Sequence, residues 1–278
     1  FNVLRQVAVV GIVAVGMTFV LLTGGIDLSV GSIIGVSAVL AAQAMLGGIP
    51  PVIAALLALL AGAALGFING VWVNELGIPP LVATLGAMTA LRGVAFVITD
   101  GLPVFGFSET FKQLGQGYVW VIPIPVVIMA GVFLIGYVVL HYTAFGRYVY
   151  GVGGNEEASR LSGIAVRKIK YIVFTLSGFL SSLAGIVMLA RINSGQPRAG
   201  TGYEIDIVTA VVLGGVSING GEGKLGFVIV GVLIMGVLSN GMILINIDEY
   251  VQWTIKGLVL IAAVGFDSVS QRKRLAAT

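Results

Sequence analysis

The chain has 278 residues, of which 58% are hydrophobic and only 10% charged, and its formal net charge is +3. Soluble domains carry roughly a quarter charged residues, so this chain has too little polar material to cover a water-facing surface. Cysteine is absent and His141 is the one histidine, which excludes a disulfide framework and disfavours a metal or acid–base cluster built on these residues. The composition predicts an all-α, polytopic membrane protein surrounded mainly by lipid.

Nine apolar stretches are long enough, or nearly so, to cross a bilayer, since each crossing needs about 20 apolar residues. They run approximately over 6–22, 29–46, 50–72, 80–98, 119–140, 169–190, 204–218, 225–244 and 250–266. The seventh is short and glycine-rich, so we expect it to be broken or only partly inserted. We expect one transmembrane domain over residues 1–278, with small extramembrane helices only in 99–118 and 141–168.

The connection Thr23–Ser32 joins the first two stretches with almost no loop. Its glycines permit a tight turn, and Asp27 and Ser29 are predicted to cap the helix that follows. A role in gating is the alternative interpretation.

Basic residues gather in two regions that four predicted spans separate. They are Arg147, Arg160, Arg167, Lys168 and Lys170 around the 141–168 connection, and Arg272, Lys273 and Arg274 in the tail. The positive-inside rule therefore places both regions, and the C-terminus, in the cytoplasm. Nine spans then put Phe1 outside, and since Phe1–Arg5 does not resemble a signal peptide, we expect one further helix before it, making ten.

The segment 142–168 is predicted to be a cytoplasmic loop that docks a soluble partner. Asn155 can cap a short helix that starts at Glu156, and Gly163 can end it. Leu161 and Ile164 are expected on one apolar side. The alternative to docking is that the loop carries charges and turns only because any long cytoplasmic loop needs them. The candidate docking residues are Glu156, Glu157, Arg160, Leu161, Gly163 and Ile164.

Three short pieces recur in the same order in residues 24–98 and 203–266. Ile26-Asp27-Leu28 resembles Ile205-Asp206-Ile207, Asn69-Gly70 recurs as Asn240-Gly241, and Arg92-Gly93 resembles Lys256-Gly257. The two copies are five spans apart, an odd number, so they would have opposite orientations. This indicates an inverted repeat of the transporter type, with the transport path where the repeats meet. Chance recurrence in a glycine-rich chain is the alternative.

Arg92 and Lys256 are the ionisable residues deepest in their predicted spans. A charge at that depth usually faces the bundle interior or a watery cavity, although a long side chain can also reach the interface from a span that sits higher. Together with the polar residues of the repeats they form a candidate translocation path: Asn69, Thr84, Arg92, Ser239, Asn240, Gln252 and Lys256.

No catalytic constellation is visible, and no residue is predicted to bind a cofactor or a metal. The run Gly220-Gly221-Glu222-Gly223-Lys224 fails the phosphate-binding pattern G-x-x-x-x-G-K-[ST], because Ile218 stands where the first glycine belongs and Leu225 follows the lysine. We read this run as a tight turn on the cytoplasmic side. The chain is therefore not expected to be an enzyme or to bind ATP itself.

Four runs resemble the membrane permease subunits of bacterial ribose-type sugar importers of the ATP-binding-cassette (ABC) class. They are Thr23–Ser32, Gly77–Leu91, Gly146–Ile164 and Gln196–Gly221. The third is similar to that family's Gly-Arg-Tyr…Gly-Gly-Asn-Glu…Arg-Leu-Ser-Gly-Ile loop, and the fourth to its Gln-Pro-x-Ala-Gly-x-Gly-Tyr-Glu…Val-Leu-Gly-Gly stretch. The likeness extends over most of the chain.

The resemblance implies a multi-pass protein of the bacterial cytoplasmic membrane that forms half of a dimeric pore, as a homodimer or with a similar subunit. It implies ATP-binding subunits inside, which carry the ATP and Mg²⁺, a sugar-binding protein outside, and no nucleic acid. Glu156–Ile164 would be the coupling segment, and one more N-terminal helix is usual in the family.

An ion-coupled secondary transporter, with Asp27 or Asp206 as the titrating group, is the main alternative, and a membrane enzyme is a third.

Overall fold

The computed structural model describes residues 2–275 of the chain, with side chains described for residues 3–269. The basic tail residues Arg272, Lys273 and Arg274 therefore fall outside the described side chains. The elements are α1 (Asn2–Leu22), α2 (Val30–Leu46), α3 (Pro51–Asn74), α4 (Pro80–Thr99), α5 (Glu109–Gln116), β1 (Tyr118–Val119), β2 (Ile122–Pro123), α6 (Ile124–Tyr142), α7 (Ala144–Gly154), α8 (Glu156–Leu161), α9 (Val166–Ile192), α10 (Tyr203–Leu213), α11 (Leu225–Leu244) and α12 (Glu249–Leu275).

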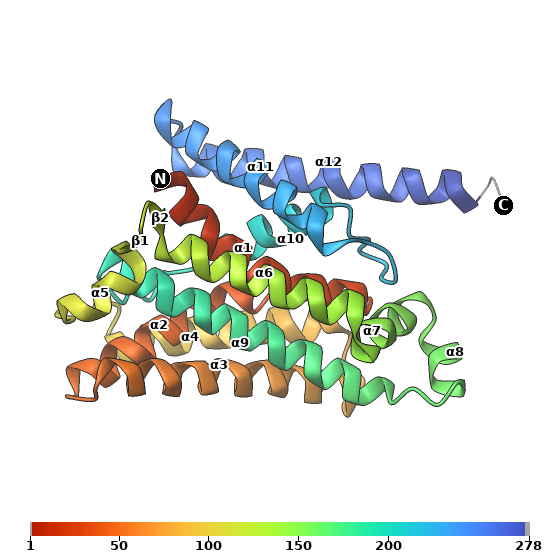
Figure 1. Ribbon diagram of the computed structural model, residues 1–278, viewed down its shortest axis with the longest axis horizontal. Helices are drawn as coiled ribbons and strands as arrows, with labels where there is room; N and C mark the ends of the chain where they lie inside the picture. The colour runs from red at the N-terminus through yellow and green to blue at the C-terminus, as the bar shows by residue number, and fades with distance from the viewer. Residues whose placement is uncertain (1, 276–278) are drawn as a thin grey trace.

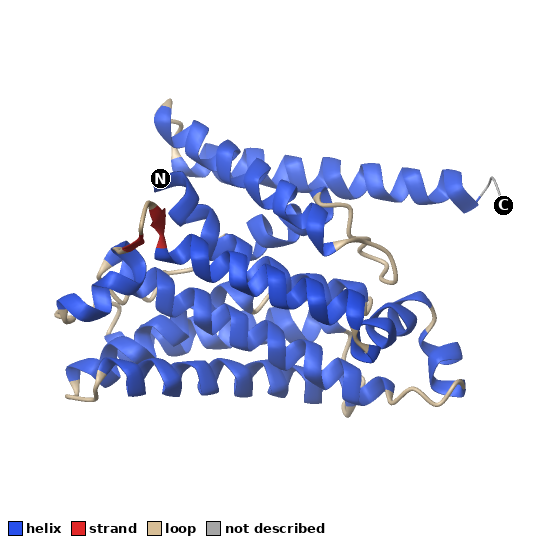
Figure 2. Cartoon of the chain, in the orientation of Figure 1, coloured by secondary structure: helices blue, strands red, loops and turns tan. Residues whose placement is uncertain are grey.

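The long helices run side by side along the longest axis of the molecule (Figure 1). The helices α1, α2, α9 and α10 lie inside the bundle and supply most of its buried apolar residues, whereas α3, α4, α6 and α11 bury a minority of theirs. Figure 2 shows that the described chain consists of helices joined by loops and turns, with one short hairpin. The apolar side chains on the outer helices are exposed to the surroundings, as expected where lipid is the solvent.

Each of the nine predicted spans contains a helix. Six of these helices, α1, α3, α4, α6, α9 and α11, are long and apolar enough to cross a membrane. The other three are α2 with 17 residues, α10 with only 11, and α12, whose apolar middle is flanked by charged residues. The chain is a polytopic helical membrane protein.

Proline sets the start of three outer helices. Pro51 and Pro80 stand at the first position of α3 and α4, and Pro125 lies in the first turn of α6. Proline suits this position because its fixed φ is already helical and its missing N–H would have had no helical partner. The fifth span was predicted from residue 119, but α6 begins at Ile124, because residues 118–123 form a hairpin whose turn residue Trp120 has φ +56°.

The interior packing of α3 on α9 depends on glycine. A Cβ added to Gly62 would lie 2.7 Å from the carbonyl oxygen of Gly178, and one added to Gly66 would lie 2.2 Å from that of Phe174. The Ser182 hydroxyl also donates to the carbonyl oxygen of Ala58 at 2.7 Å. Small residues spaced in this way let two membrane helices approach until their backbones touch.

A second close approach joins three turns at one end of the bundle. We call it the glycine junction, and it consists of Gly24, Gly153, Gly154, Gly220 and Gly221. The Gly221 N–H donates to the carbonyl oxygen of Leu22 at 2.9 Å, and a Cβ on Gly153 would lie 1.8 Å from that same oxygen. The junction therefore holds the end of α1, the end of α7 and the 214–224 loop in direct backbone contact.

Tyr150 of α7 adds a side-chain contact beside this junction. Its hydroxyl donates to the carbonyl oxygen of Gly223 at 2.8 Å. Burial raises the pKa of Tyr150 above its usual value, so the hydroxyl keeps its proton at physiological pH and remains a donor. The 214–224 loop is thus fastened to α7 just before α8 begins.

Candidate functional site

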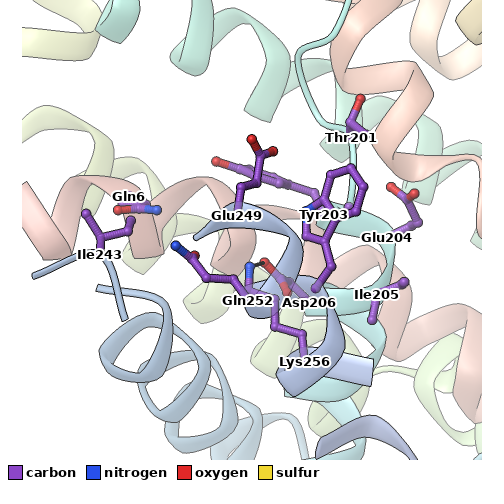
Figure 3. Close-up of a pocket in the computed structure, with 12 residues that line it drawn as sticks. Gln6, Thr201, Tyr203, Glu204, Ile205, Asp206, Ile243, Glu249, Gln252 and Lys256 are labelled. Carbon is purple, nitrogen blue, oxygen red and sulfur yellow. Dashed lines mark hydrogen bonds and ion pairs between the residues drawn. The ribbon is translucent and has the colours of Figure 1, made fainter. Parts of the chain in front are cut away.

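A cavity of about 570 Å³ lies at the N-terminal end of α10, beside several residues of the predicted path. We call it the α10 N-terminal cavity. Its lining comes from α1, from the turn before α10, from α10 itself, and from the facing ends of α11 and α12 (Figure 3). The lining residues with polar or aromatic side chains are Gln6, Thr201, Tyr203, Glu204, Asp206, Glu249, Gln252, Trp253 and Lys256.

Two ion pairs converge on the first turn of α10 at this cavity. Lys256 Nζ of α12 lies 2.6 Å from Asp206 Oδ2, and Arg92 Nη2 of α4 lies 3.6 Å from Glu204 Oε1. Figure 3 shows the Lys256–Asp206 contact in the centre of the cavity. Both carboxylates are buried, with Asp206 5% and Glu204 8% exposed. The Lys256–Asp206 pair is also hydrogen-bonded, whereas Arg92 and Glu204 are paired by charge alone. The two ion pairs tie α10 to α12 and α4.

The local sequence explains why the acids stand there. Gly202 has φ +82° and turns the chain into α10. Negative side chains in a first helical turn are stabilised by the helix dipole. The second oxygen of Glu204 lies against α2, where a Cβ on Gly31 would fall 2.1 Å from Oε2. Only glycine leaves room for this carboxylate.

The structure separates the seven candidate path residues into groups. Gln252 and Lys256 line the α10 N-terminal cavity, and Arg92 reaches it through Glu204. Ser239 lines a small adjoining cavity of about 40 Å³, which Asp206 and Lys256 also border. A cavity of this size can hold one water molecule. Asn240 is half-buried and lines neither of these two cavities.

Asn69 and Thr84 lie in a different polar cluster around the connection between α1 and α2. The Asn69 amide donates to Ser29 Oγ at 2.8 Å. Thr84 Oγ1 accepts from the Leu28 N–H at 3.1 Å and lies 3.2 Å from the carbonyl oxygen of Ile26. Both side chains are buried. Their hydrogen bonds hold α3 and α4 to this connection.

Asp27 is the centre of that cluster. Its Oδ1 accepts from the N–H and hydroxyl of Ser29, and its Oδ2 accepts from the Ser177 hydroxyl of α9 at 2.8 Å. Asp27 thus orders the turn before α2, but it accepts from no N–H inside that helix, so the predicted Asp27 cap is not present. The prediction that Ser29 also caps α2 is wrong, because its side chain makes no capping bond to the helix and its hydroxyl donates to Asp27 instead.

The predicted helix and caps in the 142–168 segment are present. Asn155 Oδ1 accepts from the Ala158 N–H at 2.8 Å at the start of α8, and Gly163 has φ +84° just after its end. Glu156 pairs with Lys170 at 2.7 Å and Glu157 with Arg160 at 3.7 Å.

The prediction that Leu161 and Ile164 lie on one apolar side is wrong. Leu161 is 81% exposed, whereas Ile164 packs against the main hydrophobic core. The left-handed turn at Gly163 sends the two side chains in different directions. Leu161 is thus left on the surface together with the charged residues of α8.

Sequence reasoning missed Glu204, Tyr203 and Trp253 as parts of one site. The available signal was the pair of acids at the beginning of an otherwise apolar stretch, Glu204 and Asp206. Among the described residues, no group of three or more histidine, cysteine, aspartate and glutamate side chains could hold a metal ion.

The sequence model of the family described as "Branched-chain amino acid transport system / permease component" matches residues 1–264. The chain is similar to the "Ribose import permease protein RbsC" of Bacillus subtilis (strain 168), with 46% identity over 96% of this chain and 83% of the relative. It is also similar to the protein of the same name from Escherichia coli (strain K12), with 47% identity over 98% and 86%.

A third relative is the "L-arabinose transport system permease protein AraH" of Escherichia coli (strain K12), with 40% identity over 95% of this chain and 80% of the relative. No solved structure matches. A polytopic helical bundle with a polar cavity between its helices agrees with these similarities. The chain belongs to the family of permease components of the branched-chain amino acid transport system type.

Proposed function

We propose that the chain is the transmembrane subunit of an ABC importer that carries a monosaccharide, ribose or a related pentose or hexose, across the bacterial cytoplasmic membrane. The observation that carries the proposal is the similarity to ribose and arabinose permeases over nearly the whole chain. The polar cavity at the end of α10 supports it, because a path for a hydrophilic solute needs hydrogen-bonding groups inside the bundle.

The proposed topology has nine crossings in this chain and a cytoplasmic C-terminus. Figure 1 supports it, since α7, α8 and the C-terminal end of α12 lie at one end of the molecule, and α5, the hairpin and the N-terminus lie at the other. The basic 141–168 region and the tail then share one side. The α10 N-terminal cavity lies toward the opposite, external side.

The inverted repeat of 24–98 and 203–266 also stays a proposal. The helix contacts support it, because α2 packs on α3 and α4 as α10 packs on α11 and α12. Both units also begin with a buried aspartate, Asp27 and Asp206.

The proposed partners are a second permease subunit, either identical or similar, two ATP-binding subunits and an external sugar-binding protein. α8 suits a coupling contact because it is short, capped, and exposes Glu156, Glu157, Arg160 and Leu161 on the cytoplasmic side. ATP and Mg²⁺ would be held by the partner subunits. ATP binding would move α8, the two permease halves would rock, and the cavity would open alternately to each side.

An ion-coupled secondary transporter is the second candidate. It would need a membrane-buried carboxylate that is free to take up and release a cation. Asp206 is held by Lys256, and Asp27 accepts three hydrogen bonds, so neither is free in this conformation. This observation favours the ABC importer.

The test is uptake of radiolabelled D-ribose, L-arabinose and D-allose into proteoliposomes that contain the permease, its ATP-binding subunit and its binding protein. Uptake of one of these sugars should require internal ATP and persist in the presence of a protonophore. Uptake that is lost with the protonophore and needs no ATP would instead support the secondary transporter.

A further inference from the structure

We propose that the α10 N-terminal cavity binds the ring form of an uncharged sugar, and that Trp253 and Gln252 of α12 contact it directly. This inference rests on the proposed function and assigns a substrate class and two contact residues to one site. Three independent features of the cavity lead to it: its charge balance, its aromatic side chains, and the fixed amide of Gln252.

The first feature is that the buried charges of the cavity are already matched. Lys256 neutralises Asp206, and Arg92 stands opposite Glu204. Glu249 is the remaining charged lining residue, and it lies exposed at the start of α12. A zwitterionic amino acid would need a buried cation for its carboxylate and a buried anion for its ammonium group. The carboxylate of such an amino acid would have to take Lys256 or Arg92 from its partner, whereas a neutral sugar leaves both pairs intact.

The charge balance of the cavity distinguishes two substrate classes within one family. The family description names branched-chain amino acids, whereas three similar relatives are named for ribose or arabinose. Breaking a buried pair leaves an uncompensated charge and is strongly unfavourable. The internal charge balance therefore favours the uncharged substrate on physical grounds that do not depend on the names.

The second feature is a pair of aromatic residues, Tyr203 and Trp253, that line the cavity together. Trp253 is 48% exposed, and a Cβ on Gly202 would lie 3.9 Å from its indole nitrogen. The indole thus lies beside the turn that starts α10. Such a side chain offers a flat apolar face for the C–H side of a sugar ring and an N–H donor for a hydroxyl.

The third feature is the side chain of Gln252, one residue before Trp253. Its Nε2 donates to the carbonyl oxygen of Ile247 at 2.8 Å, which fixes the direction of the amide. An amide has both donor and acceptor groups, as a sugar hydroxyl does. The cavity volume of about 570 Å³ is within the usual range of small-molecule sites.

The experiment has a binding arm and a transport arm. For binding, Trp72→Phe and Trp120→Phe leave Trp253 as the one tryptophan, and its emission is followed in lipid nanodiscs while D-ribose, L-arabinose, D-allose or L-leucine is added. We expect a saturable change with the sugar that the wild-type complex imports and none with L-leucine. No change with any of these sugars, or an equal change with L-leucine, would overturn the assignment.

For transport, Trp253→Ala and Gln252→Ala are compared with Trp120→Ala and Gln43→Ala. Trp120 is exposed on the hairpin. Gln43 also donates to a backbone carbonyl, that of Ile98 in the last turn of α4, but it lies outside the cavity. Losing one hydrogen bond or ring contact should raise the concentration for half-maximal uptake by about fivefold or more. The two control variants should match the wild type.

Failure of the inference and failure of the proposed function give different results. If the wild-type complex imports none of the three sugars with ATP, the proposed function fails. If it imports a sugar and the cavity variants behave like the controls, only the site assignment fails. Should Trp253→Ala not assemble, Trp253→Phe and the emission titration decide the outcome.

Discussion

Lys256 Nζ and Asp206 Oδ2 are 2.6 Å apart, although the two residues are 50 positions apart in the chain. Lys256 belongs to α12 and Asp206 to the first turn of α10. Their side chains are 17% and 7% exposed, so the pair is largely removed from solvent. The contact joins α12, which otherwise lies at the edge of the bundle (Figure 1), to the buried helix α10.

Breaking this pair should destabilise the protein more than breaking a surface pair. Lys256→Met leaves a buried carboxylate without its cation, which typically costs about 3–5 kcal/mol. Thermal unfolding of the purified protein in detergent should show a clear fall in Tm. The double variant Lys256→Met/Asp206→Leu should recover much of that loss. If the double variant instead lost more Tm than Lys256→Met alone, the coupling between Lys256 and Asp206 would be contradicted.

The matched control is the Glu109–Lys112 pair of α5, where Glu109 is 85% exposed. Exposed pairs contribute about 1 kcal/mol or less. Lys112→Met should therefore leave the Tm almost unchanged.

Gly153 should be far less tolerant of alanine than Gly154, its neighbour. A Cβ on Gly153 meets the Leu22 carbonyl oxygen at 1.8 Å, whereas one on Gly154 meets nothing within 4 Å. Forcing an extra methyl group into packed backbone typically costs about 1–3 kcal/mol. Tm and ATP-driven uptake should fall for Gly153→Ala and stay near wild type for Gly154→Ala. If the two variants behaved alike, the glycine junction would tolerate an extra methyl group between α7 and the end of α1.

Charge reversal on α8 should weaken association with the ATP-binding subunit. Glu156 pairs with Lys170 at 2.7 Å and Glu157 pairs with Arg160 only at 3.7 Å between exposed side chains, so Glu157→Lys disturbs less of α8 itself, and Glu156→Lys/Glu157→Lys is the stronger change. A loss of one favourable charge contact, about 1.4 kcal/mol, corresponds to a tenfold weaker complex. Co-purification with the ATP-binding subunit measures it. Glu109→Lys, an exposed acid at the other end of the bundle, is the control, and unchanged co-purification of the α8 variants would exclude docking there.

Removing the Asp27 carboxylate should lower stability more than removing one of its partners. Asp27→Ala leaves three donors without their acceptor, at roughly 1 kcal/mol each, whereas Ser177→Ala removes a single bond. We expect the order of Tm values to be wild type, Ser177→Ala, Asp27→Ala. Asp248→Ala is the control, because exposed Asp248 also accepts from the N–H two residues on, that of Tyr250, and it should have little effect.

The sequence predicted the helices well because hydropathy and proline position them locally. The Asn155 cap and the ends of α3 and α4 follow from neighbouring residues alone. The hairpin at 118–123 was missed because Val119, Val121 and Ile122 extend the apolar stretch of α6 toward the N-terminus, although Pro123 and Pro125 mark the true start of that helix.

The candidate site could be predicted only in part. The depth of Arg92 and Lys256 in their spans indicated charged residues that must find partners. Their partners could not be identified from spacing, since Glu204 and Asp206 are distant in sequence and are brought near by the packing of α10. Asn69 and Thr84 were polar at the right depth, but polarity does not distinguish a residue that lines a path from one that holds helices together.

In the proposed importer, the shortness of α10 would set the thickness of the barrier that a solute crosses. Eleven residues of helix span about 16 Å, roughly half of the hydrocarbon core of about 30 Å. The α10 N-terminal cavity lies at one end of this helix, and a second cavity of about 560 Å³, lined by Val212, Leu213 and residues of α12, lies at the other. The two cavities thus lie at opposite ends of α10, separated by about 16 Å of helix.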